Sequence, residues 1–171
     1  MENFGIIKDA VDGKNLFSWR DIYQKSQKLE TSIGQPCWGI DYKSLAYAWC
    51  IKTVMPIIWE NFSRDLKLIF SAYQETHSYF SIHKDLKPLP EGVVGTHSIS
   101  ILFPVSIDGG ITENLHKVST CFFDDEKRPL GCIPWEANSI VWWRSHVFHS
   151  GSDFSDQGIK TKEFFITHTY V

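Results

Sequence analysis

The sequence has no apolar run long enough to cross a bilayer, no excess of basic charge, and no linker rich in Pro, Gly or Ser. A membrane helix needs about 20 apolar residues, so we expect no membrane partner. Lys and Arg number 17 against 20 Asp and Glu, a net charge of −3. This balance disfavours a large nucleic-acid partner. With 171 residues and no internal repeat, the chain is expected to form a single domain, residues 1–171.

Several catalytic motifs are also missing. The sequence has no G-x-S-x-G motif, no Gly-rich phosphate loop and no C-x-x-C pair, which disfavours the common hydrolase, nucleotide-binding and thiol-redox classes. The four cysteines lie far apart, and we expect them to be reduced, buried side chains: Cys37, Cys50, Cys121 and Cys132. The first residues carry neither the basic nor the apolar region of a secretion signal. We therefore expect a cytoplasmic protein.

The apolar content is high, at 43% of residues, and 15% are aromatic, which is enough for a full core. In the first third, the apolar spacing is helical. Residues 16–23 and 45–51 carry apolar side chains at mixed spacings of three and four. Pro56 stands where a helix can begin, with Ile58 and Phe62 on one face.

After Phe62 the apolar period changes to two, which is typical of strands. Segments rich in turn residues separate six expected strands: 66–73, 79–86, 98–107, 119–123, 139–146 and 163–171. Short strands in this number predict a sandwich or a barrel-like jelly roll. The fold class is thus mainly β with N-terminal α-helices. Residues 1–65 are expected to form a largely helical support and residues 66–171 a jelly-roll core.

A His-x-Asp triplet lies at the end of the second expected strand. His83 and Asp85 are two residues apart, so their side chains project from the same face of a strand. An imidazole and a carboxylate that point together are two neighbouring ligands of a metal site. A third ligand must then come from elsewhere in the chain.

Two histidines near the end of the fifth expected strand are candidates for that ligand. His149 stands just past the strand, whereas His146 falls on its packing face with Trp142. We therefore favour His149, with His146 as the rival. Two imidazoles and one carboxylate leave coordination positions open, as in non-heme Fe(II) oxygenases. His168, like the histidines outside these motifs, lacks a partner at ligand spacing and is expected at the surface or the core edge.

Two lysines open the last expected strand. Lys160 and Lys162 are two apart and are expected to share a face with Phe164 and Ile166. If that face is interior, a buried ammonium needs an anion. A dicarboxylate whose other end binds the metal would supply it. The alternative is that both lysines are solvated at a strand edge.

The order of these features resembles the 2-oxoglutarate/Fe(II)-dependent oxygenases, and the end of the chain is similar to the prolyl 4-hydroxylase branch. The resemblance covers about residues 66–171 and implies a double-stranded β-helix. It implies that His83, Asp85 and His149 bind Fe(II). Lys160 would bind the co-substrate 2-oxoglutarate, with Lys162 as the alternative. The implied activity is that of a dioxygenase, which uses dioxygen to hydroxylate a small-molecule or peptidyl substrate and releases succinate and carbon dioxide.

Two other functions remain open at this point. One is a jelly-roll binding or sensing module without turnover, and the other is a cupin-like metal enzyme that does not use 2-oxoglutarate. A lysine inside the pocket distinguishes the first hypothesis from both. Substrate selectivity in such folds lies in variable loops, here residues 87–96 and 111–118, and the sequence does not identify the substrate or the oligomeric state.

Overall fold

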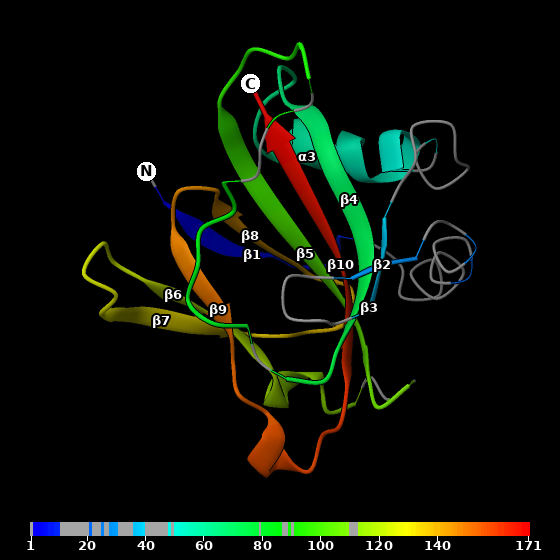
Figure 1. The fold of residues 1–171 in the computed structure, drawn as a ribbon, viewed down its shortest axis with the longest axis vertical. Coiled ribbons are helices and arrows are strands. Elements are labelled where there is room, and N and C mark those ends of the chain that lie inside the picture. The colour runs from blue at the N-terminus through cyan, green and yellow to red at the C-terminus, as the bar shows by residue number, and fades with distance from the viewer. Residues whose placement is uncertain are drawn as a thin grey trace.

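The computed structural model (Figure 1) describes residues 2–10, 21, 25, 28–30, 36–39, 48, 50–78, 80–86, 89, 91–109 and 113–171. Its strands form two antiparallel sheets. The large sheet has seven strands, in the order β1 (Phe4–Ile7), β8 (Ile140–Arg144), β5 (His97–Ile107), β10 (Lys162–Tyr170), β4 (Lys67–Thr76), β3 (Pro36–Gly39) and β2 (Lys28–Glu30). The small sheet has three, in the order β7 (Pro129–Pro134), β6 (Ser119–Phe123) and β9 (Phe148–Gly151).

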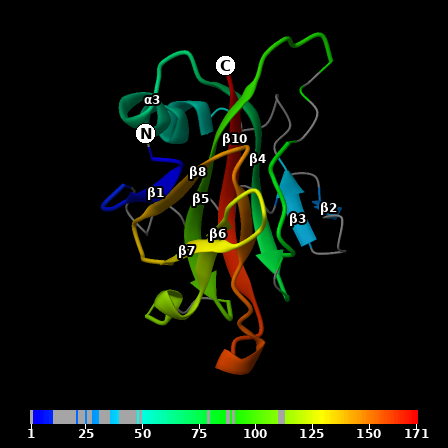
Figure 2. The ribbon, with the colours of Figure 1, turned by 90° about the vertical axis from the view of Figure 1, so that its left-hand side faces the viewer.

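Each face of the large sheet covers its own hydrophobic core. Period-two alternation sends Ile101 and Phe103 of β5 to one face, where they pack against the helical segment. Leu102 points to the other face, which meets Phe122 of the small sheet. The hairpin of β6 and β7 crosses this second face and projects beyond it (Figures 1 and 2). The space between the two sheets is therefore where inward-pointing polar side chains meet.

The expected helix at Pro56 is confirmed. A π-helical turn, Cys50–Val54, leads into α3, Met55–Asn61, and Pro56 lies in its first turn, where the missing N–H costs nothing. Met55 and Ile58 are buried against the large sheet. No helix among the described residues is long and apolar enough to span a membrane.

The expectation of helices ahead of the strands is otherwise not supported. The N-terminal third contributes β1, β2 and β3 to the large sheet, and the described helix lies only at residues 50–61. Three- and four-residue strands are too short to show a period of two, so pattern alone does not reveal them. The expected helix at 16–23, apart from the helical Asp21, and most of that at 45–51 fall outside the described residues.

The strands of the second half agree with expectation in part. β4, β5, β6, β8 and β10 each overlap an expected strand. The strand expected at 79–86 is wrong for the described residues 80–86, because its only ladder contact is an isolated bridge at His83. β7 and β9 lie outside the expected strands, because they are short and carry Pro and Gly, which are uncommon inside strands.

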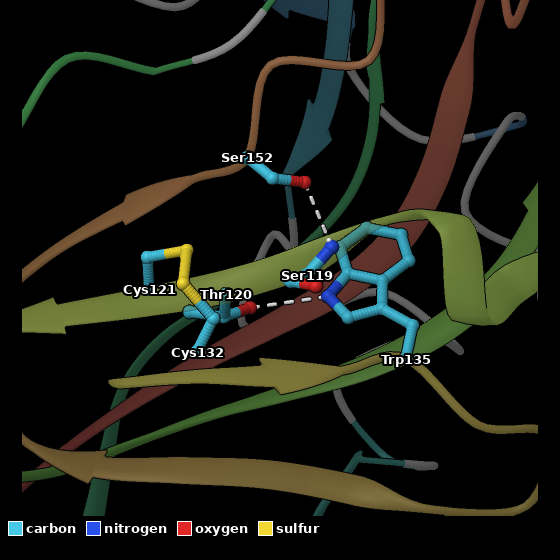
Figure 3. Close-up of a disulfide and its surroundings, with 6 residues drawn as sticks. All are labelled: Ser119, Thr120, Cys121, Cys132, Trp135 and Ser152. Carbon is cyan, nitrogen blue, oxygen red and sulfur yellow. Dashed lines mark hydrogen bonds between the residues drawn. A yellow bond between two sulfur atoms is a disulfide. The ribbon is translucent and has the colours of Figure 1, made fainter. Parts of the chain in front are cut away.

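The expectation that all cysteines are reduced is correct for Cys50 and wrong for two others. Cys50 is a buried free thiol, and burial raises its pKa to about 12. Cys121 and Cys132 form a disulfide between β6 and β7 (Figure 3). The two residues are direct partners in the antiparallel register, and the sequence analysis expects no strand that would place Cys132 opposite Cys121.

We predict that loss of this disulfide lowers the free energy of unfolding by about 3 kcal/mol, because it closes a short loop in the unfolded chain. Urea denaturation of the wild type and of a Cys121→Ala/Cys132→Ala variant tests this. Reductant should bring the wild type to the stability of the variant and leave the variant unchanged. Four reactive thiols in the unfolded, unreduced protein, which has 4 cysteines, would contradict the disulfide.

Candidate metal centre and its lysine

Two reciprocal backbone hydrogen bonds bring the distant histidines together. The His83 N–H donates to the His149 carbonyl at 3.0 Å, and the His149 N–H donates to the His83 carbonyl at 2.9 Å. Directly opposed residues of an antiparallel pair project their side chains from the same face. The two imidazole rings accordingly lie with their centroids 4.3 Å apart. The bridge thus joins the His-x-Asp segment to β9.

Asp85 lies two residues beyond His83 and projects to the same side. One ligand atom from each of His83, Asp85 and His149 lies within 4.8 Å of the other two. The Asp85 oxygens are 3.7 Å from His83 Nε2 and 3.5 Å from His149 Nε2. Asp85 and His149 are buried, while His83 is 39% exposed in its side chain. Of these three side chains, His83 is therefore the one that solvent reaches.

Backbone carbonyls hold both rings in the form that binds metals. His83 Nδ1 lies 2.6 Å from the Ser81 carbonyl oxygen, and His149 Nδ1 lies 3.2 Å from that of Val147. A carbonyl only accepts, so each Nδ1 carries the proton and each Nε2 keeps its lone pair. Burial lowers the pKa of His149, against the opposing charge of Asp85, and favours the neutral ring. Two imidazoles and a carboxylate in this state suit a divalent ion with open positions.

Trp143 fixes the carboxylate. Its indole N–H donates to Asp85 Oδ2 at 2.8 Å, and its ring centroid lies 4.5 Å from that of His149. Burial raises the pKa of Asp85, but the neighbouring histidines and this hydrogen bond outweigh burial and lower it overall. The carboxylate is thus kept ionised and oriented. A buried indole N–H needs an acceptor, and this need is the sequence signal for the role of Trp143.

His168 was also missed. It was expected at the surface or the core edge, but it is buried on β10 with Nδ1 3.6 Å from Asp85 Oδ2. Its position six residues after Lys162 puts both side chains on one face of β10. This period-two spacing was a signal that the sequence offered. His146, the rival third ligand, is exposed in the turn after β8, which ends at Arg144.

The two candidate lysines have opposite environments. β10 begins at Lys162, so Lys160 precedes the strand and does not share its face. The Lys160 N–H donates to Asp108 Oδ1 at 2.7 Å, and its side chain is exposed. Lys162 is 1% exposed, on the interior face with Phe164 and Ile166. Only Lys162 therefore satisfies the condition that the sequence set for an anion-binding lysine.

The Lys162 ammonium is enclosed by aromatic rings. Its Nζ lies 5.3 Å from the Trp135 ring centroid and 5.1 Å from that of Phe154. Its Nζ lies where a Cβ on Gly151 would stand, so a larger residue at position 151 would have to displace the ammonium. Within the described residues Nζ has no hydrogen-bond or ion-pair partner. Burial lowers its pKa to about 8, although the charge of Asp153 opposes this.

Two further polar atoms beside Lys162 lack a partner within the described part of the chain. Thr76 is the direct cross-strand neighbour of Lys162, and Gln74 that of Phe164. Thr76 Oγ1 and Gln74 Nε2 are buried without a hydrogen bond. Buried polar groups in this state are rare and mark a place where a ligand or a water can bind. An ammonium, a hydroxyl and an amide N–H₂ together suit a carboxylate.

The histidine cluster and the lysine face the same space. His149 and Gly151 are two apart on β9 and share a face, and Gly151 contacts Lys162. Two residues along a strand span about 7 Å. A metal held by His149 and an anion held by Lys162 would thus stand one short ligand apart.

No family model matches this sequence, and no curated protein matches it either. Solved structures do match. A prolyl-4-hydroxylase from Pseudomonas putida is 10% identical with a TM-score of 0.65, over 99% of this chain and 92% of that chain. A 2OG-Fe(II) oxygenase family oxidoreductase from Burkholderia pseudomallei is 9% identical with a TM-score of 0.70, over 98% and 85%.

HygX from Streptomyces hygroscopicus, whose structure holds nickel and 2-oxoglutarate, is 9% identical with a TM-score of 0.65, over 98% of this chain and 82% of that chain. At such identities the likeness establishes the fold. This chain therefore has the jelly-roll fold of the 2-oxoglutarate/Fe(II) oxygenases, which confirms the resemblance at the level of fold.

We predict that Lys162→Met raises the free energy of unfolding by roughly 3 kcal/mol below pH 8, because it removes a buried, unpartnered charge. The folded pKa of about 8 is lower than that of an unfolded lysine. The buried ammonium therefore lowers the free energy of unfolding by the full amount below about pH 8. This destabilisation is relieved as the pH rises towards about 10.4. Melting curves against pH measure the difference. Lys160→Met, at an exposed site, is the matched control and should leave stability unchanged.

Proposed function

We propose that this protein is a 2-oxoglutarate- and Fe(II)-dependent dioxygenase that hydroxylates a small-molecule or peptidyl substrate. The observation that carries the proposal is the pairing, between the same two sheets, of a His–Asp–His cluster with a buried lysine for which the described residues provide no ion pair. A binding module has no need of either feature. A metal enzyme without a dicarboxylate co-substrate has no need of the lysine.

His83, Asp85 and His149 would hold the metal. Their donor set is two neutral imidazole nitrogens and one carboxylate oxygen, which suits Fe(II) and leaves one side of the ion open. The chemistry supplied by bound Fe(II) and 2-oxoglutarate is the oxidation of a substrate C–H bond by dioxygen, with release of succinate and carbon dioxide. The contribution of the chain is to hold the ligands, exclude water and keep Asp85 ionised.

Lys162 would bind the outer carboxylate of 2-oxoglutarate, assisted by Thr76 Oγ1 and Gln74 Nε2. The separation of about 7 Å between His149 and Gly151 along β9 fits a five-carbon dicarboxylate whose inner end reaches the metal. The new ion pair would offset the desolvation of the ammonium. Lys160 takes no part in this proposal.

The deciding experiment adds Fe(II) and then 2-oxoglutarate to the apoprotein without oxygen. We expect a visible charge-transfer band, which requires both the metal and the chelating co-substrate. Asp85→Ala should abolish the band by removing a metal ligand. Lys162→Met should abolish it while the protein still binds the metal alone, and Lys160→Met should keep it.

The outcomes separate the three functions. A metal that binds without any band in the wild type, together with no succinate release in air, favours the cupin-like enzyme. Failure to bind metal at all favours the non-catalytic module. Loss of the band in Lys160→Met with retention in Lys162→Met would reassign the co-substrate site. A succinate-release screen over amino acids, peptides and small metabolites then narrows the substrate.

We predict that 2-oxoglutarate binds more weakly as the pH rises through about 8. The Lys162 ammonium has its pKa lowered to about 8 by burial, and only its protonated form attracts the carboxylate. Above this value the dissociation constant should rise by up to about tenfold per pH unit. Calorimetry with the Mn(II)-loaded protein measures it, with Mn(II) affinity over the same range as the control. A constant affinity for 2-oxoglutarate would contradict this role for Lys162.

A further inference from the structure

A row of side chains crosses the inner face of the large sheet beneath Asp85. In the register, Phe4 of β1 is opposite Trp143 of β8, and Trp143 is opposite Ser100 of β5. Ser100 is in turn opposite His168 of β10. Direct cross-strand partners share a face, so Trp143, Ser100 and His168 stand side by side. The polar members of this row lie immediately behind the carboxylate.

Both outer members of the polar row approach the same oxygen. Trp143 Nε1 lies 2.8 Å from Asp85 Oδ2, and His168 Nδ1 lies 3.6 Å from it. Oδ2 is also the oxygen 3.5 Å from His149 Nε2, and Oδ1 is the oxygen 3.7 Å from His83 Nε2. The sheet therefore contacts Asp85 through Oδ2, while Oδ1 lies towards His83.

A second contact fixes the His168 ring. Nδ1 lies 2.9 Å from Ser100 Oγ, and Ser100 Oγ lies 3.3 Å from Ser145 Oγ. The Ser145 carbonyl accepts the Asp85 N–H at 3.2 Å. The contacts thus form a closed ring, from the Asp85 side chain through His168, Ser100 and Ser145 back to the Asp85 backbone. His168, Ser100 and Ser145 are all 3% exposed or less, so water does not compete.

We propose that His168 is a positioning residue for the metal centre. Ser100 fixes its ring so that Nδ1 packs 3.6 Å from Asp85 Oδ2, beside the hydrogen bond from Trp143, and this packing keeps the carboxylate from rotating away from the ion. This inference rests on the proposed metal site. It assigns His168 no direct bond to the metal, since its Nδ1 is engaged by Ser100 and it lies outside the cluster of three ligand atoms.

The test is titration of the apoprotein with Co(II), read by affinity and by the visible d–d spectrum. His168→Leu should bind Co(II) about 10–100-fold more weakly, the usual effect of losing an outer-shell partner. The band positions should stay those of the wild type, because the ligands are unchanged. His168→Asn should recover most of the affinity, because its amide nitrogen takes the place of Nδ1.

Thr167→Val is the matched control. Thr167 is also buried on β10, and its hydroxyl is bonded to Ser71 on the opposite face, so its loss should not change Co(II) affinity. Ser100→Ala, which leaves His168 in place, should weaken binding by about fivefold, the equivalent of one neutral hydrogen bond. This variant keeps the test valid if His168→Leu does not fold.

Three results would overturn the inference. Wild-type affinity in a folded His168→Leu, or in Ser100→Ala, would show that Asp85 needs no support from this side. A shift of the d–d bands in His168→Leu like that in His149→Ala would make His168 a ligand. Failure of the wild type to bind Co(II) would instead reject the proposed metal site itself.

Discussion

The candidate centre depends on one pair of backbone hydrogen bonds, between residues 83 and 149. Outside that bridge, the described segment 80–86 joins no strand. Because an antiparallel pair fixes both the distance and the facing of the side chains, the bridge by itself aligns two imidazoles. Asp85 then follows from the alternation of an extended chain. The main chain therefore brings the two imidazoles and the carboxylate together, and side-chain contacts adjust their final orientation.

The interior between the sheets holds two uncompensated charges of opposite sign. The Asp85 carboxylate is surrounded by N–H donors and imidazoles, which keep it ionised. Among the described residues, the Lys162 ammonium has aromatic rings and the charge of Asp153 around it. The molecule thus tolerates a destabilised cation where a more stable apolar residue would fit. Such a local loss of stability is a common mark of a binding site, which agrees with the anion site proposed at Lys162.

The sequence predicts those parts of the site whose residues are close together in the chain, and it misses those whose residues are far apart. His83 and Asp85 are two residues apart, so local alternation alone places them together. The choice of Lys162 over Lys160 required the true start of β10, which Asp108 sets from a distant turn by accepting the N–H groups of Lys160 and Thr161.

The apolar pattern does not predict contacts between residues that are far apart in the chain. The partnership of Trp143 and His168 with Asp85 requires the order of strands β8, β5 and β10 in the sheet, which no local spacing encodes. The same holds for Cys121 and Cys132, which are partners only once β7 is known to pair with β6. The N-terminal strands were not predicted because three or four residues are too few to establish a period of two.

The position of β10 has a consequence for how the chain acquires its shape. It is the last strand in sequence, yet it lies between β4 and β5 in the middle of the large sheet. Until residues 162–170 have left the ribosome, both neighbours present open edges, and nascent chains with such edges are prone to aggregate. Closure of the sheet then unites segments nearly a hundred residues apart, as at Ser71 and Thr167, an arrangement typical of slow-folding proteins. We therefore expect recombinant yield to respond to translation speed and chaperone supply.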